Sequence, residues 1–441
     1  MTEMTEPNPP HDPQPAPLPG ASGQWPYPPP PGYGYPPPPP PRRRRGLIAG
    51  LVIALVLAVG GGATWFAVSQ FSSRGAGTPT EAARNLANAL NSGDIVGVLG
   101  TLAPAEAGLL ADSVKDLTDE VKRLKLLSSD ADPGAMNGLT IKTDDLVFDE
   151  ARAERVNDHL TITKLVAGKI TVTADPGKTP LTKEVRDLTG ATGRPRTETI
   201  DIAEQVHEQG EPIRIATVRI DGEWYPSLLY TIADQALQDE HQRWPSTTIP
   251  AKGADSPDEA VKELVRAALD GDLRRVIELT PPDEMGALHD AGPAILHAAD
   301  TRPSGGKLLD LATTTSDVSG GTRVTVVAAR LEDPDGEEIS MFKNGDCYTV
   351  TVTVERKTQR LCGDDVLRQL ESETSDFVPR EVRRVLGDLI GGVLRQGLGV
   401  VTTEVGGQYY VSPLRTIVDQ GLTALRGLKP DDVLSLLRAA N

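Results

Sequence analysis

The chain has 441 residues, 38% of them hydrophobic, and a formal net charge of −17; this length is typical of two or three domains. Residues 1–45 carry four Arg and three acidic side chains, and residues 46–71 carry no charge, so by subtraction the remainder carries −18. A polyanion of this size repels nucleic acid and anionic lipid headgroups, which argues against both as partners of the large C-terminal region and leaves solubility as the plain role of the charge.

Residues 1–45 form a segment rich in Pro, with Gly, Tyr and Gln, that ends in Arg42–Arg45. Such a composition cannot bury enough apolar surface to offset the entropy of ordering, so we expect a disordered arm with polyproline II character. Pro-rich runs dock on aromatic grooves. One interpretation is therefore an arm that binds a cytoplasmic reader of Pro-rich motifs, and a plain flexible arm is the alternative.

An uncharged apolar run follows the four arginines and covers residues 46–68. At about 1.5 Å per residue it is long enough to cross a hydrocarbon core of roughly 30 Å. Arg42–Arg45 favour a cytoplasmic location for one end, and Trp65 and Phe66 suit the interface at the other. We predict a transmembrane helix at 46–71 in contact with the lipid bilayer. The protein would then be a single-pass cell-membrane protein with a cytoplasmic N-terminus and extracytoplasmic C-terminal domains; a cleaved signal peptide is the alternative.

Two long segments recur in the remaining chain. The sixteen residues GEWYPSLLYTIADQAL from Gly222 match GQYYVSPLRTIVDQGL from Gly407 at nine positions, where average composition predicts about one. A second match, also without gaps, pairs the segment that starts at Thr78 with the one that starts at Ser256. Because each copy has the same beginning and the same end, we predict a tandem duplication. The predicted boundaries are a linker at 72–77, a first domain at 78–238, a linker at 239–255 and a second domain at 256–441.

Within each copy the local signals predict two helices, then a sheet, then a closing helix. Thr78 and Ser256 suit helix N-caps, and each is followed by a Pro at the first helical position and a Glu that completes a capping box. After the helices the apolar period changes to two, which predicts strands. The unit is therefore α+β, with helices packed on an antiparallel sheet. Strands are expected at 139–148, 159–174 and 213–226 in the first copy, and at 322–331 and 347–356 in the second.

The two cysteines of the chain, Cys347 and Cys362, lie in one hairpin-like segment of the second copy. An even count in one segment fits a disulfide in an oxidising compartment, and free thiols are the alternative. A zinc site needs about four ligands, and no His lies near either Cys. A disulfide that closes a loop of this length stabilises the folded state by roughly 3 kcal/mol in the chain-entropy model.

The second copy also carries an insertion before its last strands. Apolar residues in this insertion recur at helical spacing and form a stripe on one face of the expected helix. The stripe is either additional core or a groove for a partner. Its members are Val382, Val385, Leu386, Leu389 and Val393.

No catalytic residue, metal ligand set or cofactor motif can be assigned from the sequence. His207-Glu208 lacks the second His of a zinc-protease motif, and neither a nucleophile elbow nor a phosphate-binding Gly-rich loop is present. The remaining candidates are polar and aromatic residues near the end of each copy, which either hold the fold together or line a pocket. They are Trp224, Tyr225, Asp234, Gln235, Tyr409, Tyr410, Asp419 and Gln420.

The pattern [ST]-P-x-E-A, an apolar helix, Gly-Asp, a second short helix and strands that end in G-x-[WY]-Y resembles the nuclear-transport-factor-two-like, or cystatin-like cone, superfamily. The resemblance covers about residues 78–237 and 256–422, and is greatest to copies of this domain on bacterial single-pass envelope proteins. It implies a long helix in the concavity of a curved antiparallel sheet, with a pocket at the open end of the cone. The superfamily includes cyclases, isomerases, dehydratases and non-catalytic members, so the resemblance implies no particular activity.

We therefore expect a membrane-anchored extracytoplasmic protein whose duplicated, non-catalytic domains bind a ligand, a lipid or a protein partner at the cell envelope. A scaffold that acts through the Pro-rich arm is the second hypothesis, and an enzyme that uses a cone pocket is the third. An enzyme requires an acid–base pair inside at least one cone.

Overall fold

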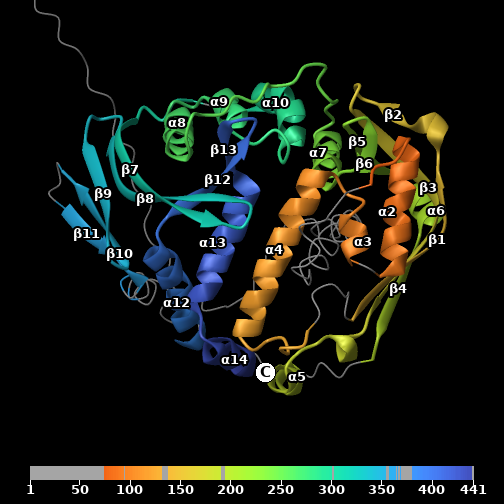
Figure 1. The fold of residues 1–441 in the computed structure, drawn as a ribbon, viewed down its shortest axis with the longest axis horizontal. Coiled ribbons are helices and arrows are strands. Elements are labelled where there is room, and N and C mark those ends of the chain that lie inside the picture. Colours follow the sequence, from red (N-terminus) through yellow and green to blue (C-terminus); the bar gives the residue numbers. More distant parts are fainter. Residues whose placement is uncertain are drawn as a thin grey trace, which may run out of the picture. The chain divides into compact units, whose positions relative to one another are not determined.

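The computed structural model describes residues 74–439 apart from 94, 132–137, 190–193, 300–301, 354–356, 364, 366–367 and 369–379. The described part contains two antiparallel sheets that curl, each with its own helices, and belongs to the α+β class (Figure 1).

The first copy places helices on a six-stranded sheet in which β1, β3, β5 and β6 lie side by side and β2 and β4 also pair with β3. Its helices are α2 (Pro79–Ser92), α3 (Ile95–Leu99), α4 (Pro104–Arg123), α5 (Lys183–Thr189), α6 (Ile202–Gln209) and α7 (Leu228–Asp239). Its strands are β1 (Leu139–Phe148), β2 (Glu154–Arg155), β3 (Leu160–Ala174), β4 (Arg196–Asp201), β5 (Ile213–Ile220) and β6 (Glu223–Pro226).

The second copy has a seven-stranded sheet in the order β11-β10-β9-β8-β12-β13, with β7 also paired to β8. Its helices are α8 (Pro257–Leu269), α9 (Leu273–Glu278), α10 (Gly286–Ala298), α12 (Arg380–Gln396), α13 (Pro413–Gly427) and α14 (Pro430–Ala439). Its strands are β7 (Lys307–Val318), β8 (Gly321–Glu332), β9 (Glu338–Asn344), β10 (Cys347–Val352), β11 (Lys357–Leu361), β12 (Gly399–Val405) and β13 (Gln408–Ser412).

The pairing path β1-β3-β5-β6 of the first sheet has its counterpart in β7-β8-β12-β13 of the second. In both copies the residue two positions before the N-cap of the first helix also bridges the last strand, through Ala76 with Trp224 and through Ala254 with Tyr409. The beginning and the end of each copy are therefore joined by main-chain hydrogen bonds. Strands β10 and β11 and helix α12 are additions of the second copy.

The predicted N-caps of the first helix in each copy are present. The hydroxyls of Thr78 and Ser256 accept hydrogen bonds from the backbone N–H groups of Glu81 and Glu259, which is the N-cap geometry. The capping box differs in its second half, because the Glu81 carboxylate accepts from the N–H of Gly77 rather than of Thr78.

Both predicted hairpin turns require a left-handed backbone. The φ angles are +50° and +91° at Asp221 and Gly222, and +61° and +79° at Gly406 and Gly407. Two consecutive residues with positive φ make the turn whose twist matches antiparallel strands. These turns set the register of β5 with β6 and of β12 with β13, and so fix where the closing helices α7 and α13 begin.

Two members of the apolar stripe on the inserted helix α12 belong to the core. Val385 is buried in a cluster with Leu124 of the first copy and Leu428 of the second, and Leu389 packs against the same cluster. Leu386 is 39% exposed, and Val382 and Val393 are half-buried. The core interpretation therefore holds for Val385 and Leu389, and the groove interpretation stays a prediction for the rest of the stripe.

The linker at 239–255 is more structured than its polar sequence suggested. Ile249 is buried, and its N–H donates to the carbonyl of His289. The His289 ring lies within hydrogen-bond distance of the Ile249 carbonyl, 2.8 Å from Nδ1, and of the Thr280 carbonyl, 3.0 Å from Nε2. This buried histidine therefore supports the linker.

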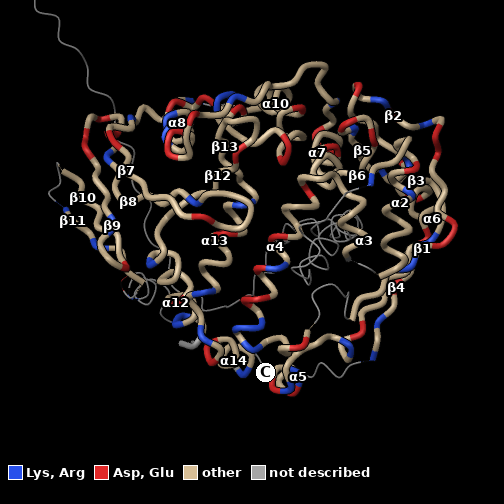
Figure 2. Tube along the Cα trace, viewed as in Figure 1, with Lys and Arg blue, Asp and Glu red and all other residues tan. Residues whose placement is uncertain are grey.

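The expected transmembrane helix, and with it the single-pass cell-membrane localisation, is contradicted. Among the described residues, no helix combines the length and the apolar character needed to cross a bilayer. Helix α4 has 20 residues, but acidic and basic residues are interspersed along its C-terminal half (Figure 2). Each such charge costs about 3 kcal/mol at the bilayer centre on insertion scales. Residues 46–71, on which the expectation rested, and the Pro-rich arm at 1–45 lie outside the described residues.

Helices α12 and α13 are in close contact through Gly392 and Gly427. A Cβ added at Gly392 would lie 2.9 Å from Cα of Gly427, so Gly392→Ala should force the helices apart and lower the free energy of unfolding by about 1–3 kcal/mol. Gly421 on α13 has no atom within 4 Å of an added Cβ. Gly421→Ala is the control and should stabilise the protein by up to about 1 kcal/mol through helix propensity. Urea unfolding of both variants is the measurement, and equal stability would contradict the packing argument.

Candidate functional site

A buried carboxylate near the start of α4 and of α10 organises the end of each copy. The hydroxyl of Ser227 donates to Glu106, and the hydroxyl of Ser412 donates to Glu284 at 2.6 Å. All four side chains are buried. The same hydroxyls accept from the first turns of α7 and α13, so each Glu–Ser pair fixes the helix N-terminus that follows the last strand.

The two predicted aspartates, Asp234 and Asp419, form internal ion pairs. Arg214 donates to Asp234 through Nε at 2.5 Å and Nη2 at 2.8 Å, and Trp244 donates to the same carboxylate at 2.9 Å. Asp419 is bound by the buried guanidinium of Arg323. Burial raises the pKa of Asp419 and lowers the pKa of Arg323, because burial disfavours the charged form of each group. These contacts hold the closing helices on their sheets.

The predicted glutamines also bind protein groups. Gln235 is exposed and donates to Asp239 one turn away at 3.0 Å, whereas Gln420 donates to the carbonyl of Gly399 at 2.6 Å. Their equivalence in sequence therefore does not extend to their contacts.

The predicted aromatic residues act as pairs on the last strands. Tyr225 and Tyr410 are buried and donate to the side chains two residues earlier, Glu223 at 2.9 Å and Gln408 at 3.0 Å. Trp224 and Tyr409 are half-buried and carry the main-chain bridges described above. Each of the eight predicted residues thus contacts groups of its own copy or of the adjoining linker, and the structure does not gather them into one site.

Among the described residues, Glu106 has no ion-pair partner of the kind that its counterpart Glu284 has. In the second copy, Arg415 donates to Glu284 through Nε at 2.5 Å. The equivalent position of the first copy is Tyr230, which brings no guanidinium to Glu106, and burial raises the pKa of Glu106 to about 7. The buried acid accepts hydrogen bonds from the hydroxyl of Ser227 and the N–H of Leu228, which is a structural role.

A histidine that the sequence did not single out lies against the second copy. His159 Nε2 is 2.6 Å from Oδ2 of Asp290, and the hydroxyl of Tyr230 donates to the same oxygen at 2.9 Å. The hydrogen bond to Asp290 raises the pKa of His159. Burial alone would raise the pKa of Asp290, but the bonds from His159 and Tyr230 lower it. An acid, an imidazole and a phenol therefore meet between the copies.

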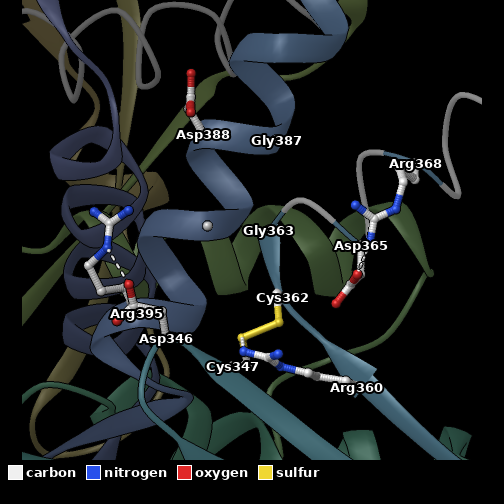
Figure 3. A pocket seen from close by; sticks show the side chains of 11 residues that line it. Asp346, Cys347, Arg360, Cys362, Gly363, Asp365, Arg368, Gly387, Asp388 and Arg395 are labelled. Atoms are coloured by element: carbon white, nitrogen blue, oxygen red, sulfur yellow. Dashed lines mark hydrogen bonds and ion pairs between the residues drawn. A yellow bond between two sulfur atoms is a disulfide. The ribbon is translucent and has the colours of Figure 1, made fainter.

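A polar cavity of about 360 Å³ lies beside the disulfide of the second copy (Figure 3). The sulfur atoms of Cys347 and Cys362 are bonded and join the start of β10 to the end of β11. Helix α12 forms the opposite wall, and Gly363 and Gly391 approach so closely there that an added Cβ on Gly363 would lie 2.8 Å from Cα of Gly391. Three cationic and three anionic side chains line the cavity: Arg360, Arg368, Arg395, Asp346, Asp365 and Asp388.

The arginines of the cavity differ in how they are paired. Arg368 binds Asp365, and Arg395 lies 3.5 Å from Asp346. Arg360 donates to Sγ of Cys347 at 3.2 Å, and sulfur is a weak acceptor. Among the described residues, Arg360 is thus the one guanidinium of the three that contacts no carboxylate within ion-pair distance.

Comparisons with known protein families, curated proteins and solved structures found no match for this chain. Within the described ranges, no group of three or more His, Cys, Asp or Glu side chains is arranged to hold a metal ion.

Two features of these sites had a signal in the sequence. Continuing the gap-free match beyond Glu106 and Glu284 pairs AGLLAD with MGALHD, so that Asp112 aligns with Asp290. The cavity has a weaker signal, since three arginines flank the cysteines and the inserted helix without a periodic pattern.

The pKa of Glu106 generates a second prediction. A folded-state pKa of about 7, above the ordinary value of 4.5, means that the folded protein binds more protons than the unfolded chain between these pH values. Stability is then greatest below pH 4.5 and falls as pH rises to about 7, by roughly 3 kcal/mol for this group. Glu106→Gln should remove that part of the pH dependence, as measured by urea unfolding across the range.

Glu284→Gln is the matched control for this experiment. It removes the carboxylate that Arg415 binds and should lower stability at neutral pH without removing the slope. An unchanged slope in Glu106→Gln would show that this carboxyl is not the titrating group.

Proposed function

We propose that this chain is a non-catalytic binding protein whose second copy takes a small anionic ligand, a carboxylate or a phosphate, in the cavity beside the disulfide. The observation that carries the proposal is a cavity of about 360 Å³ whose lining includes three arginines, with the Arg360 guanidinium lying against the disulfide (Figure 3). This volume is in the range of small-molecule pockets. Guanidinium groups match the planar oxygen pairs of carboxylates and phosphates.

Arg360 is the residue assigned to contact the ligand. An anionic oxygen is a much stronger acceptor than the disulfide sulfur that Arg360 contacts here. Arg368 and Arg395 already bind carboxylates of the protein, so they would supply positive potential rather than new bonds. The disulfide and the close approach of Gly363 to α12 support the cavity wall.

The non-catalytic part of the proposal is supported by the fate of the repeated polar residues. The Glu–Ser and Asp–Arg pairs of both copies bind one another and the ends of helices. The proposed membership of the nuclear-transport-factor-two-like superfamily is supported by helices packed on a curled antiparallel sheet in each copy (Figure 1). A lipid or a protein is the alternative ligand for these domains.

Calorimetric titration tests the proposed site. The wild-type protein should bind succinate or inorganic phosphate but not the cation choline, and Arg360→Gln should weaken binding at least tenfold, because a hydrogen bond to a charged group is lost. Arg330→Gln is the control, since Arg330 is a half-exposed arginine of the same sheet outside the cavity.

The two anions identify the ligand class, since a preference for succinate assigns a carboxylate and a preference for phosphate assigns a phosphate. Absence of binding by both anions, or equal affinity in Arg360→Gln, would contradict the proposal.

A further inference from the structure

Two contacts between the copies are reciprocal. The hydroxyl of Tyr230 on α7 of the first copy donates to Asp290 on α10 of the second, at 2.9 Å. Nη1 of Arg415 on α13 of the second copy donates to Asp112 on α4 of the first, also at 2.9 Å. Positions 230 and 415 are equivalent in the duplication, and so are positions 112 and 290. Each copy therefore uses the same closing-helix position to bind the same aspartate of the other copy.

The helices that carry these residues pack against each other in the same reciprocal way. Helix α13 packs against α4, and α10 packs against α7. Since α4 corresponds to α10 and α7 corresponds to α13, the two helix contacts are two versions of one contact. A surface whose residue i meets residue j of its partner, while j meets i, has the geometry of a twofold, isologous interface.

We infer that the face formed by the third and closing helices of each copy, α4 with α7 and α10 with α13, is a self-complementary interaction surface. Its partner is a second copy of the same domain. The chain supplies that partner from within itself. The two copies then form an internal dimer, and the binding free energy of this surface holds them together independently of the linker at 239–255.

Asp290 and Arg415 are largely buried polar groups of the surface, whereas the Asp112 side chain is 25% exposed. Asp290 is 8% exposed, and the side chain of Arg415 is 12% exposed while it binds both Asp112 and Glu284. Removing one partner of a buried charged pair leaves the other uncompensated, which makes these contacts strong determinants of association.

One side of the surface is extended in a way that favours the internal pair. Arg123 at the end of α4 donates to the carbonyls of Leu425 and Leu428, and Arg426 donates to Glu120. The cluster of Leu124 and Val385 lies at the same end and includes the inserted helix α12, which the first copy lacks. Two first copies from different chains could not make these additional contacts.

Cleavage of the folded chain tests the inference. A protease site inserted after Ser246, where the linker is exposed, should yield two fragments that remain associated in gel filtration and in sedimentation. Asp112→Arg places a cation against Arg415 and should weaken fragment association roughly 100-fold or more. Asp119→Arg on the same helix is the control, because Asp119 is 64% exposed and binds Lys115 of its own copy. Fragments that separate in the wild type, or equal behaviour of the two variants, would overturn the inference.

Placing the residue of one copy at the equivalent position of the other gives a second test, in which the interface is expected to be kept. If the two contacts are equivalent, Arg415→Tyr should keep fragment association within about tenfold of wild type, because tyrosine already binds the equivalent aspartate in the other half. Arg415→Ala, which leaves Asp112 without a donor at this position, should abolish fragment association. Tyr230→Arg should bring a guanidinium to Glu106, as Arg415 is brought to Glu284, and should abolish the pH dependence assigned to Glu106. Equal loss in Arg415→Tyr and Arg415→Ala would show that the two contacts are unrelated.

Discussion

The buried hydrogen bond between a glutamate and a serine, present once in each copy, is the interaction on which the remaining structure depends. Glu106 with Ser227, and Glu284 with Ser412, join the start of the third helix to the start of the closing helix. A buried acid must find donors, and the helix N-terminus supplies them through its unpaired N–H groups. This bond fixes the first turn of α7 and of α13. It therefore directs the side chain three residues after each Ser toward the copy interface, and the side chain seven residues after it toward the sheet.

The copies have kept their acids more strictly than their bases. Asp234 and Asp419 are equivalent, but Arg214 comes from β5 and Arg323 from β8. A buried carboxylate without a cation is strongly destabilising. Each copy therefore needs a guanidinium beside this aspartate, but the guanidinium can come from either strand. At positions 230 and 415 the same logic gives tyrosine in one copy and arginine in the other, and both donate to an aspartate across the interface. Divergence has therefore changed the donor while it preserved the acceptor.

How far the sequence predicts this structure depends on the range of the interactions concerned. Helix caps, hairpin turns and period-two strands depend on neighbours within a few residues, and β1 has the bounds 139–148 that its pattern indicated. The duplication also predicted which polar residues recur. The partners of those residues lie far along the chain, as Glu106 does from Ser227, so a pattern of local spacing could not identify them. The same limit explains why the linker, which is polar in sequence, contributes the buried Ile249, and why the aromatic and amide candidates were assigned no particular contacts.

The position of the cavity follows from what the duplicated parts already do. In each copy the third and closing helices are used at the copy interface, and the polar residues kept in both copies bind one another. A change there that created space for a ligand would remove a buried partner and destabilise both halves at once. Strands β10 and β11 belong to the second copy alone, and helix α12 contacts the first copy through the cluster of Val385 and Leu389 rather than through the residues that line the cavity. The disulfide between Cys347 and Cys362 reinforces the strand side of the cavity covalently. The cavity and the disulfide thus lie in the part of the second copy that is not duplicated, where polar groups face open space on a side of α12 other than the one that packs at the copy interface.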